Sequence, residues 1–376
     1  LSFDASTFEI WGALLNGGRL VLMHPDQRGP RELDAAVRNN GVTTLWLTAA
    51  LFHFLAAEHL EIFHPLRQLL AGGDVLSPAH VERVLREMPH LRLINGYGPT
   101  ENTTFTCCHT IRPESLNGRS IPIGTPIGNT RVYVLDDQGE PVPRGVAGEL
   151  FVSGDGLALG YFGAPELTAE KLIDLDFEET ARDRAYRTGD LVRFRYDGVL
   201  EFLGRRDNQL KLRGHRIEPA EIENALLALA DIREAVVFAR RWSDGEQQLV
   251  AGVVTKGSKE LEVQALRAAL RRTLPATQIP AHFVRIAEVP RTANGKVDYD
   301  ALKALPLDAG HGSAAARKPP TDEEKKLAAI FAELLKREEI FAEDDFFALG
   351  GHSLMAMQLT SRIGSVFGVQ LPVAEI

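Results

Sequence analysis

The apolar residues in the first part of the chain follow two alternating patterns. Short continuous apolar runs, of the kind that form buried strands, occur at Arg19–Met23, Thr43–Leu47, Gln68–Ala71 and Leu91–Ile94. Apolar residues recur at helical spacing in three segments, Glu32–Asn39, Leu51–Glu58 and Ala79–Glu87. Alternating strands and helices predict a parallel α/β sheet, in which ligand loops follow the carboxyl ends of the strands. Two glycine-rich segments, Gly72–Asp74 and Asn95–Gly98, follow such strands, so we expect a binding site there.

From about residue 110 the pattern changes to strands separated by turns. Apolar runs at Arg131–Leu135, Gly148–Val152 and Val199–Leu203 are divided by turn sequences rich in Gly, Pro and Asp. This pattern predicts an antiparallel, barrel-like β region. A small α+β unit is expected next, with its helices and strands at Ala220–Leu229, Leu261–Leu274, Glu234–Phe238 and Leu249–Val254.

The last part of the chain has the pattern of a small all-α helical bundle behind a linker. Residues 306–320 are poor in large apolar side chains, which is typical of a flexible connection. Thr321–Glu324 is a capping box that opens a helix. The apolar face expected for that helix consists of Leu327, Ile330, Phe331, Leu334 and Leu335. A second helix is expected after Ser353, because apolar residues recur at helical spacing from Leu354 to Phe367.

The composition is that of a globular protein with two or three domains. The chain has 376 residues, 44% of them hydrophobic and 25% charged. A net charge of −9 argues against a nucleic-acid-binding surface. No apolar run reaches membrane-spanning length, and the N-terminus has no signal-peptide pattern. Cys107 and Cys108 are adjacent and are the only cysteines, so neither a disulfide framework nor a zinc site is expected. These features favour a cytoplasmic location.

One serine has a distinctive setting. In Asp344-Asp-Phe-Phe-Ala-Leu-Gly-Gly-His-Ser-Leu354, Ser353 stands at a predicted helix start behind two glycines. Free backbone N–H groups and the positive end of the helix dipole favour a phosphate ester at such a position. The segment resembles the 4′-phosphopantetheine attachment site of a carrier domain. An ordinary serine N-cap is the alternative, but the complete eleven-residue context favours the attachment site.

Seven further segments occur in a characteristic order. They are Phe3–Ser6, Asn95–Glu101, Gly148–Gly154, Tyr186–Asp190, Gly204–Gln209, Lys211–Glu218 and Asn294–Lys296. In this order and spacing they resemble the adenylation domains of nonribosomal peptide synthetases, which belong to the adenylate-forming superfamily. The resemblance implies a large N-terminal subdomain over 1–206, with its α/β part ending near 106, and a C-terminal subdomain over 207–305. A linker over 306–320 and a peptidyl carrier domain over 321–376 would follow.

The resemblance implies that a carboxylate attacks the α-phosphorus of ATP, which gives an acyl adenylate and pyrophosphate. Tyr97 would lie beside the adenine and Thr100 at the α-phosphate, while Glu101 would hold Mg²⁺, a cation that prefers oxygen ligands. Asp190 would accept the ribose hydroxyls. The full set of ATP-binding residues implied is Gly73, Asn95, Tyr97, Gly98, Thr100, Asp190, Arg205 and Lys296.

Three positions are implied to act in the two half-reactions. Lys296 would bridge the substrate carboxylate and the α-phosphate during adenylation. Asp207 resembles the hinge about which the C-terminal subdomain turns after adenylation. The turn would bring the Lys211 face to the site, where the pantetheine thiol attacks the adenylate.

The amino-acid pocket is implied to consist of residues at fixed offsets from these motifs. They are Asp4, Ala5, Phe8, Trp46, Leu70, Gly72, Gly96, Thr104, Phe105 and Lys296. Asp4 would meet the substrate ammonium group and Lys296 its carboxylate. The remaining walls are bulky and apolar, which resembles a valine-type pocket. Isoleucine or leucine could also be activated, because one methylene changes the free energy of binding by only about 1–3 kcal/mol.

The expected partners are L-valine, a phosphopantetheinyl transferase and neighbouring synthetase domains such as a condensation domain; nucleic acid and membrane are not expected. Because the family's phosphate-binding loop should precede Leu1 and another carrier helix should follow Ile376, we expect a fragment that does not adenylate by itself. Two other functions are open: a stand-alone acyl-CoA or luciferase-like ligase, or a carrier and interaction unit alone. Asp4 and the tethered Ser353 region argue against the first.

Overall fold

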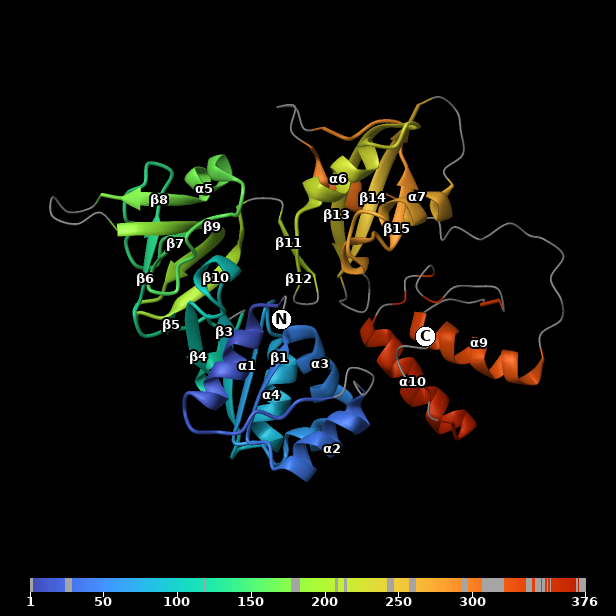
Figure 1. Cartoon of the computed structure of the whole chain (residues 1–376), viewed down its shortest axis with the longest axis horizontal. Coiled ribbons are helices and arrows are strands. Elements are labelled where there is room, and N and C mark those ends of the chain that lie inside the picture. The colour runs from blue at the N-terminus through green and yellow to red at the C-terminus, as the bar shows by residue number, and fades with distance from the viewer. Residues whose placement is uncertain are drawn as a thin grey trace. The chain divides into compact units, whose positions relative to one another are not determined.

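The computed structural model (Figure 1) describes residues 3–23, 29–117, 120–176, 183–206, 209–212, 215–241, 247–256, 262–291, 297–305, 321–335, 340–341, 346, 349, 351, 353–369 and 371. The chain divides into two compact units, which we call the N-terminal unit (Leu1–Asp207) and the C-terminal unit (Asn208–Ile376). Each is described by itself.

The N-terminal unit begins with a five-stranded mixed sheet and its helices. The strands, in sheet order, are β1 (Thr44–Thr48), β2 (Gln68–Gly72), β3 (Arg92–Tyr97), β4 (Cys107–Thr110) and β5 (Thr125–Pro126). The first three are parallel, as predicted, whereas β4 and β5 are antiparallel to their neighbours. The helical elements of this part are α1 (Ala5–Leu14), α2 (Pro30–Asn40), α3 (Ala49–Glu58), η1 (Leu60–Phe63), α4 (Pro78–Glu87), η2 (Thr100–Asn102) and η3 (Pro113–Asn117).

The helices α2, α3 and α4 lie where the apolar spacing predicted them, with local signals at their ends. α2 and α4 each have proline in the first turn, where the missing N–H costs no hydrogen bond. Gly41 ends α2 with φ 60°, a left-handed conformation that glycine adopts without strain. α3 is capped by Thr48, whose hydroxyl accepts from the Leu51 N–H at 3.4 Å. The core between helices and sheet contains fully buried Phe52, Leu55, Phe63, Leu69 and Leu93.

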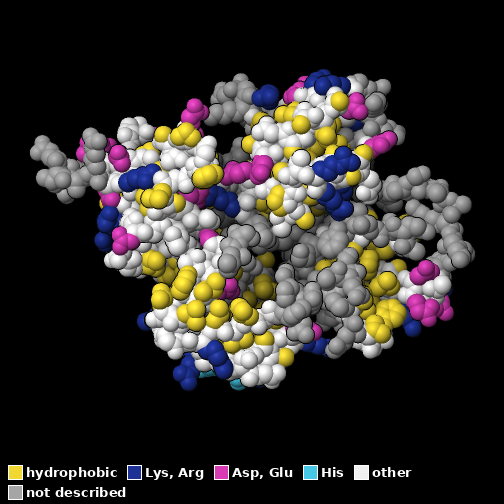
Figure 2. Space-filling view, viewed as in Figure 1, with side chains coloured by type: hydrophobic (Ala, Val, Ile, Leu, Met, Phe, Trp, Pro, Cys, Tyr) yellow, Lys and Arg dark blue, Asp and Glu magenta, His cyan; other side chains and the backbone are white. Residues whose placement is uncertain are grey.

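Two predictions for this region need correction. Arg19–Met23 is not a strand, and Leu22 is 81% exposed. The reason is that an apolar run becomes a strand only beside a partner, and β1 pairs with β2 alone in the described sheet. Helix α1 was not predicted either, and its side chains Trp11 and Leu14 are 52% and 49% exposed. Figure 2 shows hydrophobic side chains gathered over the part of the unit where α1 lies.

The rest of the N-terminal unit is an antiparallel sheet. Its order is β10-β9-β7-β6, with β8 also paired to β9. The bounds are β6 (Thr130–Leu135), β7 (Gly148–Gly154), β8 (Leu172–Leu175), β9 (Asp183–Phe194) and β10 (Leu200–Arg205), and α5 spans Pro165–Lys171. Three of these strands match the predicted runs, but the central strand β9 was not predicted. Within the described residues β6 and β10 do not pair with each other, and β10 is instead bridged through Leu200 to Gly124, which precedes β5.

The C-terminal unit contains a hairpin and a three-stranded sheet. The hairpin pairs β11 (Leu210–Leu212) with β12 (His215–Ile217). The sheet has the order β13 (Ile232–Arg241), β14 (Gln247–Thr255), β15 (His282–Arg285), with β15 parallel to β14. Its helices are α6 (Pro219–Leu227), α7 (Val263–Leu270), η4 (Ala276–Gln278) and α8 (Tyr299–Lys303). β14 is buried on both faces because Val237, Ala251 and Leu266 belong to one apolar cluster and Phe238 and Val250 to another.

Two helices of the predicted carrier region follow. α9 (Asp322–Leu335) starts with the predicted capping box, in which the Glu324 N–H donates to Thr321 Oγ1 at 3.1 Å and the Thr321 N–H donates to Glu324 Oε2 at 2.6 Å. α10 spans Ser353–Phe367. The predicted apolar face of α9 packs in one cluster with Phe346, Leu359 and Ile363. The predicted linker, residues 306–320, lies outside the described residues.

Candidate active site

The loop after β3 has a backbone that few sequences could adopt. A Cβ on Gly98 would clash with the Thr104 carbonyl and come within 2.7 Å of the Thr106 nitrogen, so only glycine fits. Thr103 and Thr104 have φ of 49° and 64°, which is rare for a β-branched residue and costs about 1–3 kcal/mol each. Hydrogen bonds hold the strained turn: the Thr103 hydroxyl donates to the Gly156 carbonyl and that of Thr104 to the Asp4 carbonyl, both at 2.7 Å.

The same loop is joined to the start of α1 through a side chain. Thr100 Oγ1 donates to Asp4 Oδ2 at 2.8 Å, across 96 residues of sequence. Asp4 occupies the N-cap position of α1, yet its side chain caps no N–H of that helix. The structure therefore brings together the residue predicted to meet the substrate ammonium group and the residue predicted at the α-phosphate.

Aromatic side chains of the predicted amino-acid pocket make two contacts. The Phe8 and Phe105 rings meet edge to face with centroids 5.4 Å apart. Trp46, on β1, packs against Phe3 at 5.5 Å. The Trp46 Nε1 atom is buried and has no hydrogen-bond partner among the described residues. The aromatic residues predicted to line the pocket therefore contact other rings.

At two positions of the predicted pocket, close packing within the fold requires glycine. A Cβ on Gly72 would overlap the Gly96 carbonyl of the neighbouring strand. A Cβ on Gly96 would lie 2.5 Å from the Phe105 ring. Glycine at both positions therefore lets β2, β3 and the Phe105 ring approach closely, and this holds whatever the substrate is.

Three predicted nucleotide residues meet in a buried cluster. Tyr97 Oη donates to Asp190 Oδ2, and Arg205 Nη1 donates to Asp190 Oδ1 at 2.5 Å. Arg205 also donates to the Thr188 carbonyl at 3.0 Å, and Asp190 is 1% exposed. Burial and the neighbouring Asp190 carboxylate hold the pKa of Tyr97 well above its usual range, so Tyr97 remains a donor. Asp190 and Arg205 are cross-strand partners on β9 and β10, and the hydrogen bond from Tyr97 links this pair to the end of β3.

Glu101, the predicted Mg²⁺ ligand, has a partner that the sequence did not indicate. Tyr161 Oη donates to Glu101 Oε1 at 2.5 Å, and the glutamate is only 9% exposed. Burial, together with hydrogen bonding to Glu101 and Tyr186, raises the pKa of Tyr161, so the phenol stays protonated. The aromatic residue 60 positions from the glutamate carried no signal by which sequence reasoning could have found it.

The remaining predicted site residues lie in several elements of the fold, and two of them are outside the described residues. Asn95 is buried and its amide donates to the Pro122 carbonyl at 2.8 Å, so it supports the sheet. Gly73 turns with φ 79° after β2, and Ala5 and Leu70 are buried. Lys211 lies in β11 and Ser353 is the first residue of α10, but neither side chain is described. Asp207 and Lys296 lie outside the described residues.

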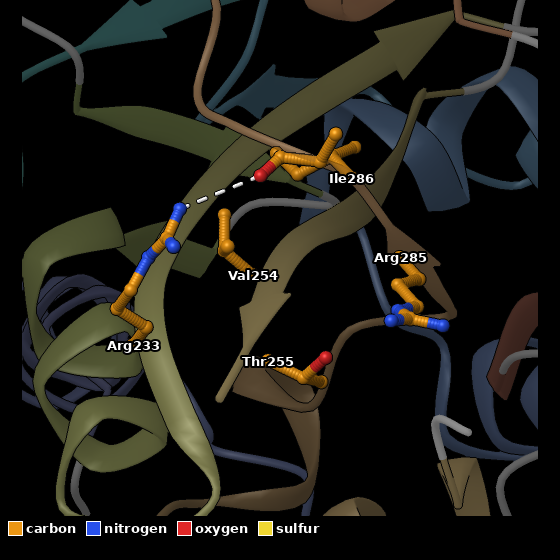
Figure 3. A pocket seen from close by; sticks show the side chains of 6 residues that line it. Arg233, Val254, Thr255, Arg285 and Ile286 are labelled. Carbon is orange, nitrogen blue, oxygen red and sulfur yellow. Dashed lines mark hydrogen bonds between the residues drawn. The ribbon is translucent and has the colours of Figure 1, made fainter. Parts of the chain in front are cut away.

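A hollow of about 490 Å³ lies elsewhere, at one end of the three-stranded sheet (Figure 3). None of its lining residues, Arg233, Val254, Thr255, Arg285, Ile286 and Ala287, was predicted to bind substrate or nucleotide. Arg233 donates to the Ala287 carbonyl at 3.4 Å and pairs with Glu234 at 3.3 Å. Its side chain thereby ties β13 to the segment after β15.

Comparison with known proteins identifies the kinds of domain that the chain contains. Residues 1–162 match the family of AMP-binding enzymes, residues 221–296 the AMP-binding enzyme C-terminal domain, and residues 325–376 the phosphopantetheine attachment site. Adenylation domains use ATP and Mg²⁺ and carrier domains bear 4′-phosphopantetheine, which confirms the cofactors that the resemblance implied. No helix in the described part of the chain is both long and apolar enough to cross a membrane.

Several relatives are large synthetases. The chain is 44% identical over its whole length to tyrocidine synthase 3 of Brevibacillus parabrevis, and 99% of it matches gramicidin S synthase 2 of Brevibacillus brevis at 43% identity. It spans only 6% and 8% of those proteins.

Two solved synthetase structures are similar to almost the whole chain. PA1221, described as a nonribosomal peptide synthetase protein containing adenylation and carrier domains, matches the entire chain at 39% identity with a TM-score of 0.82, and the chain covers 62% of it. The four-domain synthetase AB3403 matches 99% of the chain at 36% identity with a TM-score of 0.51, and 27% of AB3403 is covered. The chain therefore belongs to the nonribosomal peptide synthetases, as an amino-acid-activating, AMP-forming adenylation domain followed by a carrier domain.

Proposed function

We propose that, within the full-length protein, these domains activate an amino acid, most favourably L-valine, and pass it to a phosphopantetheine thiol on Ser353. In the first step a carboxylate oxygen of the amino acid bonds to the α-phosphorus of ATP, and the bond to pyrophosphate breaks. In the second step the thiol sulfur attacks the carbonyl carbon of the aminoacyl adenylate, AMP leaves, and the thiol proton is released. The observation that carries the proposal is the hydrogen bond between Thr100 and Asp4, which links the residue proposed to contact the α-phosphate to the residue proposed to bind the substrate ammonium group.

The cluster around Asp190 is suited to hold the nucleoside of ATP. A ribose offers two adjacent hydroxyl donors, and the buried Asp190 carboxylate is an acceptor that already receives the hydroxyl of Tyr97 at the end of β3. Ribose hydroxyls would replace the Tyr97 hydroxyl as donors, while Arg205 stays paired to the carboxylate and keeps its negative charge compensated. Lys296 would supply a cation to the reacting carboxylate and α-phosphate.

Glu101 would hold Mg²⁺ together with phosphate oxygens. In the described part of the chain no group of three or more His, Cys, Asp and Glu could hold a metal by itself. A single carboxylate that works with substrate phosphates is the usual arrangement for Mg²⁺, so the residues present fit this cation. Bound there, Mg²⁺ would neutralise charge on the phosphates as pyrophosphate departs.

The preference for valine rests on the apolar rings. The Phe8–Phe105 pair and Trp46 offer no charged group to a substrate side chain, and the Trp46 N–H is buried rather than available to a polar substrate. Asp4 accounts for selection of an amino acid over other carboxylic acids. The direct test is amino-acid-dependent exchange of pyrophosphate into ATP by the full-length protein, across all twenty amino acids. If an aromatic, acidic or basic amino acid outpaced valine, this pocket assignment would be wrong.

We expect Trp46→Leu to move the preference toward larger substrates. Removal of the indole enlarges an apolar wall, and fit in such pockets is worth about 1–3 kcal/mol per methylene, so the rate for larger amino acids relative to valine should rise roughly ten-fold or more. The measurement is the same exchange profile, with Phe54→Leu as a control, because Phe54 is a buried aromatic residue of α3 outside the pocket. A profile that Trp46→Leu leaves unchanged would place Trp46 in the core only.

The residue before the predicted hinge is firmly held. The Arg206 N–H donates to the Gly189 carbonyl at 2.8 Å, and its guanidinium reaches Glu149 at 3.2 Å and Asp137 at 2.8 Å. The division between the two units follows directly, between Asp207 and Asn208. We propose that Arg206 anchors the fixed end of the hinge.

For Arg206→Met we expect thioester formation to slow more than adenylation. Loss of about 1 kcal/mol of anchoring corresponds to about five-fold in rate, and Glu149 keeps Arg187 as a partner, which spares the fold. The two half-reactions are measured separately, as pyrophosphate exchange and as loading of radiolabelled amino acid. Arg193→Met is the matched control, because Arg193 pairs with Glu201 at 2.8 Å within the same sheet. Equal slowing of both half-reactions would contradict the anchoring role.

The carrier part implies two kinds of partner. A phosphopantetheinyl transferase must attach the arm to Ser353, because the thiol that receives the amino acid belongs to the arm. A neighbouring synthetase domain, such as a condensation domain, would then take the aminoacyl group from the thioester.

A further inference from the structure

Tyr161 makes a short contact to the predicted metal ligand. Its hydroxyl donates to Glu101 Oε1 at 2.5 Å. The residue belongs to the segment between β7 and α5, far in sequence from the β3 loop that carries Glu101. A charge-assisted O–H···O⁻ bond of this length is among the stronger hydrogen bonds in proteins.

The backbone on both sides of this contact is also fixed. The Ala158 N–H donates to the Glu101 carbonyl at 2.8 Å, so the segment is tied to the glutamate's main chain as well as to its side chain. The Tyr161 N–H donates to Thr168 Oγ1 at 2.9 Å, and the Thr168 hydroxyl donates to the Ala164 carbonyl at 2.9 Å. These hydrogen bonds fix the segment that leads into α5, and they thereby hold the Tyr161 phenol beside Glu101.

A glutamate carboxylate needs such a partner to hold one orientation. The terminal torsion of glutamate is broad, so an unrestrained carboxylate samples many rotations. A hydrogen bond to one oxygen removes this freedom and orients the group before the metal arrives. Partners that orient metal ligands in this way typically change metal affinity or activity by about 10–100-fold when removed.

We infer that Tyr161 is a positioning residue, which orients the Glu101 carboxylate for the Mg²⁺ that accompanies ATP. This inference rests on the proposed function, because Glu101 is the metal ligand only if the site adenylates. It adds a residue from outside the β3 loop to the metal site. Tyr161 itself does not touch the metal or the reacting atoms.

The test compares Tyr161→Phe with the unmodified full-length protein. The substitution keeps the ring and removes only the hydroxyl. We expect the Mg²⁺ concentration for half-maximal pyrophosphate exchange to rise about ten-fold or more, with the KM for the amino acid unchanged. Binding of Mn²⁺ in the presence of ATP, followed by the loss of the free-ion electron paramagnetic resonance signal, should weaken by a similar factor without any turnover.

Two controls separate positioning from a general loss of structure. Tyr133→Phe removes a hydroxyl that donates to another carboxylate, Asp183, at 2.7 Å, and it should leave metal dependence unchanged. In a Glu101→Gln background, Tyr161→Phe should add no further loss of Mn²⁺ binding, since its effect passes through the carboxylate.

The outcomes distinguish failure of the proposed function from failure of the Tyr161 inference. If the unmodified protein neither exchanges pyrophosphate nor binds Mn²⁺ with ATP, the proposed function fails and this inference fails with it. If the unmodified protein does both and Tyr161→Phe leaves the metal dependence unchanged, only the inference is overturned. Additive losses in the double variant would likewise overturn it, because Tyr161 would then act independently of Glu101.

Discussion

Replacement of Ser353 by alanine is expected to abolish loading of the carrier completely. With a phosphopantetheinyl transferase and coenzyme A, the unmodified protein should gain the mass of one phosphopantetheine. The serine oxygen bonds to the phosphorus that joins the arm to the nucleotide, and adenosine 3′,5′-bisphosphate leaves. Ser353→Ala has no such oxygen, so neither the arm nor any thioester-bound amino acid should be found by intact mass measurement.

The position of Ser353 supports this expectation. It is the first residue of α10, where backbone N–H groups without helical partners favour a phosphate ester. The turn before it is defined by Gly351, whose N–H donates to the Phe346 carbonyl at 2.8 Å. A Cβ on Gly351 would lie 2.5 Å from the Phe346 ring, which is itself buried against Phe331. The turn that presents the serine is thus built on the apolar core of the carrier.

A serine from the same helix provides the control. Ser365→Ala, at an exposed position of α10, should be modified as fully as the unmodified protein. Gly351→Ala should keep the serine and yet slow the modification, because the turn must shift to accommodate the added methyl group. A phosphopantetheine mass that persists in Ser353→Ala would show that another residue carries the arm.

The parts of the fold that the sequence predicted are those held by apolar side chains. β2 and β3 are buried runs, β1 is an apolar run in which Leu47 is buried, and the helices between them have an apolar face, so spacing alone located them. The sequence pattern did not predict β9, although β9 is the central strand of its sheet. Thr188 and Asp190 are buried polar residues of β9, and their hydrogen-bond partners come from other strands. Because these buried positions are polar, they interrupt the alternation of apolar and polar residues that would indicate a strand.

The site could be predicted in its residue types but not in its contacts. Resemblance identified Asp4, Thr100 and Glu101 individually. Their hydrogen bonds to one another and to Tyr161 join segments far apart in the sequence, and such contacts arise only after folding. The same applies to Gly72 and Gly96, whose need for glycine comes from the neighbouring strand and ring rather than from a turn.

The second large effect is expected at Asp4. A carboxylate that meets the substrate ammonium group contributes both a charge and a hydrogen-bond acceptor. Loss of one partner of a desolvated charge pair costs about 2–5 kcal/mol, which corresponds to roughly 30- to 5,000-fold. Asp4→Ala should therefore lower kcat/KM for the amino acid within that range in pyrophosphate exchange.

A second variant separates the charge from the contact with Thr100. Asp4→Asn keeps a carbonyl oxygen that can accept the Thr100 hydroxyl, which now lies 2.8 Å from Asp4 Oδ2, but it removes the negative charge. Thr100→Val removes the donor and keeps the charge. We expect Asn to retain the fold and the loop position, so that its loss reports on the ammonium group alone.

The decisive comparison uses two substrates that differ only at that group. For valine and its α-hydroxy acid analogue, the unmodified protein should strongly favour valine, because only valine carries the cation that Asp4 would neutralise. In Asp4→Asn this preference should be lost, because a neutral amide does not stabilise the ammonium group of valine electrostatically. Thr100→Val should slow the reaction of both substrates and leave the preference for valine unchanged. An equal loss for both substrates in Asp4→Asn would show that Asp4 acts through the Thr100 loop and not through the substrate.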